Sequence, residues 1–184
     1  MRIFLSIAIP TACKDGLGAC VGHLQRSGVE ARWVPMGNMH LSLVFLGEVA
    51  DIDVVTDCAT HAASTIASFD IQVDGLGVFG RRGRPRVLWA GVKPCSALMH
   101  LQERLVQVLT DVGFPLETRA YMPHVTLGRI KPVHKVPSDL SRILRRVEEN
   151  MPAFDFPVAG FDIMQSYLDN QGSRYEVVEK IAFG

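Results

Sequence analysis

Residues 39–49 read MHLSLVFLGEV, and residues 121–130 read YMPHVTLGRI. Both stretches contain the tetrapeptide His-x-Ser/Thr-Leu within an apolar, β-branched run that is typical of a β-strand, and one copy lies in each half of the 184-residue chain. Because side chains alternate between the two faces of a strand, His40 and Ser42 share one face, as do His124 and Thr126. Two such pairs on two similar strands predict a symmetric site with two groups that can move protons.

The sequence around both motifs extends this pattern over nearly the whole chain. The features that carry it are Arg2-Ile3-Phe4 at the start, ARWV at residues 31–34, FLGEV at 45–49, GLGVF at 75–79, RVLWA at 86–90, Pro123, and Gly128-Arg129. Together they resemble the 2H phosphoesterase superfamily, which is named for its paired H-x-[ST]-x motifs, and within it the bacterial RNA 2′,3′-cyclic phosphodiesterases, also called 2′-5′ RNA ligases. Ser42 stands where this subgroup more often has Thr, but it keeps the hydroxyl donor.

Strand patterns come in adjacent groups between helix patterns, which indicates an α+β fold with antiparallel sheets. The resemblance implies two pseudo-symmetric lobes, each a small, mainly antiparallel sheet backed by helices, with the active-site cleft between them. We expect residues 1–184 to form a single bilobal domain. The sequence predicts helices at 14–26, 51–68 (with Asp51 as the cap), 96–112 and 138–150, and strands at 2–8, 31–34, 40–46, 69–73, 87–92, 121–130, 154–158, 161–166 and 175–181, the last two joined by a turn at 169–172.

The composition bounds the class of protein. Hydrophobic residues make up 48% of the chain, which is enough for a packed core, and 19 basic residues balance 19 acidic ones. No overall charge therefore attracts nucleic acid, and any basic site must be local. The densest basic segment holds Arg81, Arg82, Arg84 and Arg86. It reads equally well as a solvated loop, because Gly83 and Pro85 are turn residues, or as a loop that grips phosphate at the edge of a cleft.

The cysteines Cys13, Cys20, Cys58 and Cys95 form no C-x-x-C pair and do not match zinc-ligand spacing, so we interpret them as small buried residues in a reducing compartment. The apolar run near the start is short and is broken by Pro10, which favours a first strand over a signal sequence. No run reaches the length needed to span a bilayer. We therefore expect a cytoplasmic enzyme, a monomer with no obligate protein partner and no contact with membranes.

Opening a 2′,3′-cyclic phosphate requires two proton transfers, one from the attacking water and one to the departing ribose oxygen. One neutral and one protonated histidine can perform both, so His40 and His124 are the predicted catalytic residues. The hydroxyls of Ser42 and Thr126 could bind the non-bridging phosphate oxygens. We expect no cofactor and no metal, since no carboxylates cluster beside these histidines in the sequence. The resemblance implies that His40 donates the proton and His124 accepts it.

Phe45 and Arg129 each lie five residues after a motif histidine. Strict alternation would point both away from the histidine face, but a bulge near Gly47 or Gly128 could turn them towards it. The resemblance implies that Phe45 stacks on a base and that Arg129 binds phosphate. The alternatives are a core residue for Phe45 and a surface ion pair for Arg129. The remaining histidines, His23, His61, His100 and His134, are expected to be structural or solvent-facing.

Three functions compete at this point. The first is a metal-independent enzyme that hydrolyses RNA 2′,3′-cyclic phosphate ends to 2′-phosphates, with reverse 2′-5′ ligation by the same two proton transfers. The second is a phosphodiesterase for a small cyclic nucleotide. The third is a nucleotide- or RNA-binding module without turnover. An intact histidine in both motifs disfavours the third, because binding alone needs no acid–base pair.

Overall fold

The structure is a computed structural model that describes residues 1–81, 83–117, 119–169 and 172–184. Within these ranges the elements are, in chain order, β1 (Arg2–Ala8), α1 (Thr11–Arg26), β2 (Arg32–Trp33), a 3₁₀ turn (Met36–Asn38), β3 (His40–Glu48), α2 (Ile52–Ala63), β4 (Phe69–Arg81), β5 (Arg84–Val92), α3 (Ser96–Asp111), β6 (His124–Arg129), α4 (Leu140–Glu148), β7 (Phe154–Val158), β8 (Gly160–Asp169) and β9 (Gly172–Ala182). The predicted α+β class with antiparallel pairing is confirmed.

The strands of the described ranges form one antiparallel sheet with the order β7-β4-β5-β6-β3-β1-β8-β9, and β2 pairs beside β6. The motif strands β3 and β6 are central neighbours, joined by one registered pair, Leu41 with Val125. Strands β3, β1, β8 and β9 form the β3 half of the sheet, and strands β6, β5, β4, β7 and β2 form the β6 half. The two small sheets that the resemblance implied are therefore halves of one open sheet, related about the Leu41–Val125 pair.

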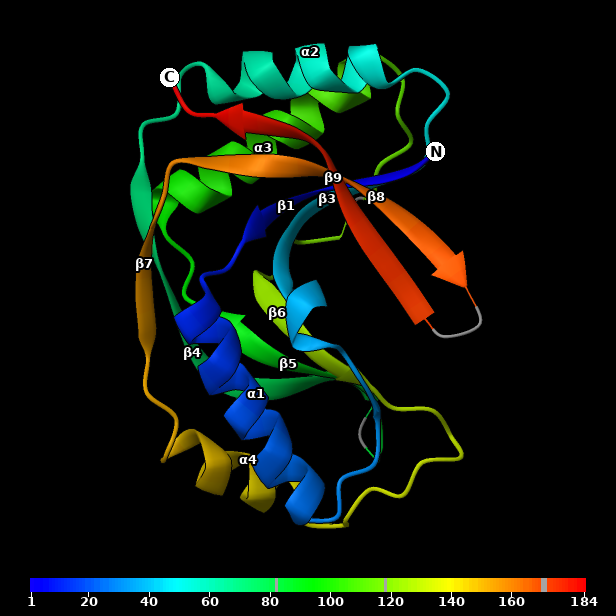
Figure 1. The fold of residues 1–184 in the computed structure, drawn as a ribbon, viewed down its shortest axis with the longest axis vertical. Coiled ribbons are helices and arrows are strands. Elements are labelled where there is room, and N and C mark those ends of the chain that lie inside the picture. Colours follow the sequence, from blue (N-terminus) through cyan, green and yellow to red (C-terminus); the bar gives the residue numbers. More distant parts are fainter. Residues whose placement is uncertain (82, 118, 170–171) are drawn as a thin grey trace.

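Two helices cover each half of the sheet (Figure 1). Helices α2 and α3 pack together over the β3 half, and α1 and α4 pack together over the β6 half. The chain crosses between the halves, so that a helix that follows a strand of one half can cover the other half. Helix α1 follows β1 of the β3 half but lies over the β6 half, while α3 follows β5 of the β6 half and contacts β3.

Local sequence explains why these helices form where they do. Asp51 caps α2 as predicted, because its carboxylate accepts a hydrogen bond from the backbone N–H of Asp53 at 3.0 Å. Helix α3 presents one apolar stripe to the core, and all of its members are completely buried: Leu98, Leu101, Leu105 and Leu109. Replacing one such leucine by alanine costs about 2–5 kcal/mol of stability in well-packed cores.

Several predicted boundaries were wrong. Strand β4 continues to Arg81 instead of ending at residue 73, and it forms a long hairpin with β5. The register shifts between Val73 and Leu76, where Gly75 has a φ of 82°. A glycine bulge therefore carries the strand through a segment that looks like a loop in sequence. The second motif strand begins only at His124, after Pro123, which cannot donate a ladder hydrogen bond.

The helix predictions differ from the structure at their ends. Helix α1 begins at Thr11, α2 ends at Ala63, and α4 spans only Leu140–Glu148. The turn predicted at 169–172 includes residues 170 and 171, which lie outside the described residues. Within the described part of the chain, no helix combines the length and the apolar character that a bilayer-spanning segment needs.

Candidate active site

The candidate site lies on one face of the two motif strands. Leu41 and Val125 are fully buried in the core. Because side chains alternate along each strand, their sequence neighbours project from the opposite face of the sheet. These neighbours, all half-buried, are His40, Ser42, His124 and Thr126. The single Leu41–Val125 pair thus brings together the four residues that the sequence predicted.

The two histidines are held in the same way. His40 Nδ1 lies 2.8 Å from the backbone oxygen of Asn38, and His124 Nδ1 lies 2.7 Å from the backbone oxygen of Met122. A carbonyl oxygen only accepts, so Nδ1 carries the proton in both rings. In the neutral state this leaves each Nε2 as an unprotonated base, and in the charged state each Nε2 is an acid. Both motifs therefore present a proton-transfer atom in an equivalent setting.

His40 lies in an aromatic recess. Its ring centroid is 5.0 Å from that of Phe4 and 5.3 Å from that of Tyr175, and its Nε2 lies 3.1 Å from the Ser42 hydroxyl oxygen. Burial lowers the pKa of His40, and the positive charges of Lys14 and His124 add to this effect, while the hydrogen bond to Asn38 opposes it.

His124 also lies beside two aromatic rings. The Phe79 centroid is 4.8 Å from that of His124 in an edge-to-face arrangement, and the Trp89 centroid is 6.5 Å away. The Trp89 indole lies directly over Gly77, where an added Cβ would come within 2.2 Å of the ring. Gly77 therefore makes room for the ring that flanks His124. Each catalytic candidate has two aromatic neighbours, which continues the two-fold relation of the motifs.

Phe45 is brought to this face by an irregularity in β3. The register against β1 shifts after Ser42, which pairs with Ser6, so that Phe45 pairs with Phe4. One extra residue in β3 thus reverses the alternation and places Phe45 on the same face as His40. The Phe45 side chain is 63% exposed, and its ring stacks on Phe4 with 5.6 Å between centroids. The interpretation of Phe45 as a core residue is therefore wrong.

Arg129 is turned in the same manner. The β5–β6 register shifts next to Gly128, so that Trp89 pairs with Thr126 and Val87 pairs with Arg129. The bulge predicted near Gly128 is present, and Arg129 shares the face of Thr126. Arg129 is exposed, and it takes no part in the ion pairs formed among the described residues. The alternative of a surface ion pair is not supported there.

The sequence did not predict two hydrogen bonds that tie the site together. The Tyr121 hydroxyl, three residues before His124, donates to the backbone oxygen of Ser42 at 2.9 Å and so links the two motifs. Burial raises the pKa of this phenol, which keeps it protonated as a donor. The Asn38 side chain donates to the backbone oxygen of Ser173 at 2.7 Å and joins the first motif to β9. Neither contact has a local sequence signal, because each depends on strands that meet only in the folded sheet.

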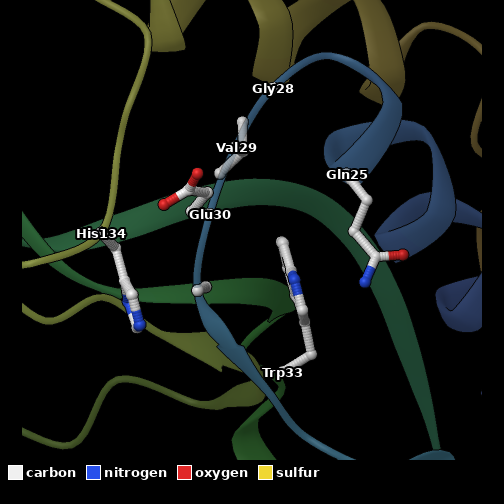
Figure 2. Close-up of a pocket in the computed structure, with 7 residues that line it drawn as sticks. Gln25, Gly28, Val29, Glu30, Trp33 and His134 are labelled. Carbon is white, nitrogen blue, oxygen red and sulfur yellow. The ribbon is translucent and has the colours of Figure 1, made fainter.

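Three of the other histidines are solvent-facing, as expected. His23, His61 and His100 are exposed on helices. His134 accepts a hydrogen bond from the backbone N–H of Lys131 and lines a separate hollow of about 370 Å³. Figure 2 shows this hollow with the Trp33 ring between His134 and Gln25. In the described ranges, no three His, Cys, Asp or Glu side chains gather in a way that could hold a metal ion.

The sequence is similar to a known protein family and to named relatives. Residues 21–170 match the profile of the 2′-5′ RNA ligase superfamily. The chain is 33% identical to the RNA 2′,3′-cyclic phosphodiesterase of Thermotoga maritima, with 100% of this chain and 96% of that protein covered. It is 32% identical to the protein of the same name from Aeropyrum pernix, with 86% of this chain and 89% of that protein covered.

Solved structures have the same fold. A Thermus thermophilus protein superposes with a TM-score of 0.83 at 25% identity, and the match covers 100% of this chain and 98% of that protein. The apo form of E. coli LigT superposes with a TM-score of 0.76 at 24% identity, and the match covers 99% of this chain and 96% of LigT. LigT has also been crystallised with 3′-AMP. The family resemblance read from the paired motifs is confirmed.

Proposed function

Because the chain belongs to the 2′-5′ RNA ligase superfamily of 2H phosphoesterases, we propose that it hydrolyses RNA 2′,3′-cyclic phosphate ends to 2′-phosphates by paired histidine catalysis. One observation carries this proposal. His40 and His124 each bind a backbone carbonyl through Nδ1 and lie on one face of two paired strands, with Nε2 left for proton transfer. The relatives from Thermotoga maritima and Aeropyrum pernix carry the name of this activity.

The chemistry follows from that arrangement. In the proposed reaction, Nε2 of His124 takes a proton from water as the water oxygen bonds to phosphorus. The bond from phosphorus to the ribose 3′ oxygen breaks, and Nε2 of His40 gives that oxygen a proton. Attack and departure are in line, so the acid and the base must lie on opposite sides of the phosphate. The antiparallel Leu41–Val125 pair, with one histidine next to each partner, supports this arrangement.

The pKa of His40 bears on its role as the acid. Burial lowers this pKa in the free protein, which disfavours the protonated form that a donor needs. A bound phosphate diester places negative charge beside the imidazole and favours that form. We therefore expect substrate binding to raise the pKa of His40 and to prepare it as the donor.

The neighbouring residues fit supporting roles. The Ser42 hydroxyl, now 3.1 Å from His40 Nε2, and the Thr126 hydroxyl can donate to non-bridging phosphate oxygens, where charge grows in the transition state. Arg129 offers a guanidinium on the same face, and such a fork matches phosphate oxygens. Phe45 offers an exposed ring on which a base can stack.

Two histidines supply both proton transfers, so the proposed reaction is independent of a metal ion. Reverse 2′-5′ ligation would use the same transfers, with the 5′-hydroxyl of a second strand in place of water, and hydrolysis should dominate because water is concentrated. We also propose a cytoplasmic location, which is supported by four free cysteines, three of them buried.

Turnover in the presence of a chelator tests the proposal. A short oligonucleotide with a 2′,3′-cyclic end should be converted to the 2′-phosphate in excess EDTA, with no requirement for added metal. The His40→Ala and His124→Ala variants serve as controls against a contaminating nuclease. Absence of turnover by the wild-type protein, turnover that stops in EDTA and returns with a divalent ion, or a 3′-phosphate product would each contradict the proposed function.

A further inference from the structure

The tip of the β4–β5 hairpin carries a group of arginines outside the reaction centre. Gly80, Arg81, Arg84 and Arg86 line a hollow of about 360 Å³, and the three arginines are exposed. Arg82, which the sequence also placed here, lies outside the described residues. The segment that reads as a loop is the end of a paired hairpin, and Arg81 lies directly across from Arg84. We call Arg81, Arg84 and Arg86 the arginine hairpin.

Among the residues that the structure describes, Arg81, Arg84 and Arg86 form no ion pair with a carboxylate. The ion pairs among side chains in the described ranges involve other residues: Lys93 with Asp74, Arg119 with Glu117, Arg142 with Asp139, and Arg174 with Glu176. The whole chain has equal numbers of basic and acidic residues, so this cluster is a local excess. Like charges held in a hairpin repel one another, and an anionic ligand would relieve that repulsion.

The sheet register connects this hairpin with the reaction centre. Phe79 pairs with Val87, which in turn pairs with Arg129, so the three share the face of the catalytic candidates. Arg81 follows Phe79 by two positions along β4 and pairs with Arg84 across the hairpin. Two residues of a strand span about 7 Å. The Phe79 ring itself lies 4.8 Å from the ring of His124, so the arginine hairpin begins two residues beyond a side chain that contacts His124.

We infer that the arginine hairpin binds backbone phosphates of the RNA strand whose cyclic end occupies the candidate active site. This inference rests on the proposed function. A 2′,3′-cyclic phosphate terminates the 3′ end of an RNA, so the phosphates that reach the hairpin belong to the nucleotides on its 5′ side. Guanidinium forks match phosphate oxygens, and contacts of this kind position a strand without reading its bases. The hairpin therefore favours an RNA strand over a free cyclic nucleotide, whatever the sequence of that RNA.

The double variant Arg81→Ala/Arg84→Ala tests this inference against a matched control. The control variant Arg145→Ala/Arg146→Ala also removes two positive charges, but from exposed positions on α4. Each variant is assayed with a nucleoside 2′,3′-cyclic phosphate and with a short single-stranded RNA that has a cyclic end. The hairpin variant should have a higher KM for the RNA than the wild type. Its kcat/KM for the mononucleotide should stay within about twofold of the wild-type value, because only the RNA carries flanking phosphates. The α4 variant should match the wild type on both substrates.

A binding measurement separates this inference from the proposed activity. A labelled RNA with a 3′-phosphate end is titrated by fluorescence anisotropy over a series of salt concentrations. For single strands each lost phosphate contact lowers the slope of log K against log salt by about 0.7, so the hairpin variant should lose up to about 1.4. The variant Arg81→Lys/Arg84→Lys keeps both charges and should retain most of the wild-type slope of log K against log salt.

The inference fails if the hairpin variant keeps the wild-type salt slope, if the α4 control loses as much, or if mononucleotide turnover falls as far as RNA turnover. Binding with the predicted slopes but without turnover would refute the proposed function and leave the RNA surface in place. Turnover with unchanged slopes would refute the RNA surface alone.

Discussion

Ser42 and Thr126 occupy matching positions but have different surroundings. The Ser42 hydroxyl oxygen is 3.1 Å from Nε2 of His40, and in the described part of the chain Thr126 makes no corresponding bond to His124. In the proposed complex both hydroxyls turn to the phosphate. We expect Ser42→Ala and Thr126→Ala each to lower kcat/KM by an amount equivalent to roughly 1–3 kcal/mol, which is less than the loss from either histidine change.

Steady-state kinetics with a cyclic-ended RNA measures this effect. Ser42→Thr and Thr126→Ser, which keep the hydroxyl, are the matched controls and should retain most of the activity. If the alanine variants turn over as fast as the wild type, the hydroxyls only pack between strands, and the phosphate must be held by other groups.

The four candidate motif residues could be placed on one face from sequence, but the facing of Phe45 and Arg129 could not. Alternation placed His40, Ser42, His124 and Thr126 correctly, because no bulge separates them within a motif. For Phe45 and Arg129 alternation alone gave the wrong face, since each strand gains one residue between the motif and these side chains. A bulge depends on the partner strand, so its position is only weakly encoded in the strand that contains it.

Secondary-structure elements far apart in sequence also build the walls of the site. Phe4 on β1 and Tyr175 on β9 flank His40, and Phe79 on β4 and Trp89 on β5 flank His124. The strands themselves could be predicted from their composition, but their order in the sheet could not. That order decides which aromatic rings meet which histidine.

The link between the 3₁₀ turn and β9 leads to a prediction about Asn38. Its carbonyl accepts from His40 Nδ1, while its side-chain amide donates to Ser173 on β9, the strand that carries Tyr175. Asn38→Ala keeps the carbonyl and removes the tether. We expect kcat to fall by roughly tenfold, the order of one net hydrogen bond in a positioning role, with little change in KM.

Met122 provides the matched control, because its carbonyl holds His124 in the same way and its exposed side chain has no amide. Met122→Ala should have near wild-type kcat. Asn38→Asp cannot donate to Ser173, and its negative charge should also raise the pKa of His40, which an NMR titration of the imidazole would detect. Equal kcat values for Asn38→Ala and Met122→Ala would show that the tether does not position His40.

Across the entire chain, the exchange of helices between the halves of the sheet ties the two motifs together. Helix α1 leaves the β3 half to cover the β6 half, and α3 does the reverse. We propose that residues 1–184 form one domain that unfolds as a unit. The family resemblance implied two lobes, but the sequence contained no sign of this exchange, because a helix pattern does not say which part of the sheet the helix will cover.

Calorimetry should therefore record one transition, with equal calorimetric and van't Hoff enthalpies. Leu105→Ala, a fully buried change in α3, should lower the stability of the whole transition by about 2–5 kcal/mol and should not split it. Two resolved transitions, with only one sensitive to Leu105→Ala, would mean that the halves are independent units.

The pH dependence of kcat/KM tests most directly whether His40 and His124 act as an acid and a base. The wild-type profile should be bell-shaped, and each alanine variant should be slower by about 10²–10⁴-fold. If His40 is the acid, His40→Ala should lose the fall at high pH and keep the rise at low pH. His124→Ala should lose the rise and keep the fall, with a midpoint below the ordinary histidine pKa because burial lowers the pKa of His40. A full bell in both variants, or near wild-type turnover by either one, would contradict the account.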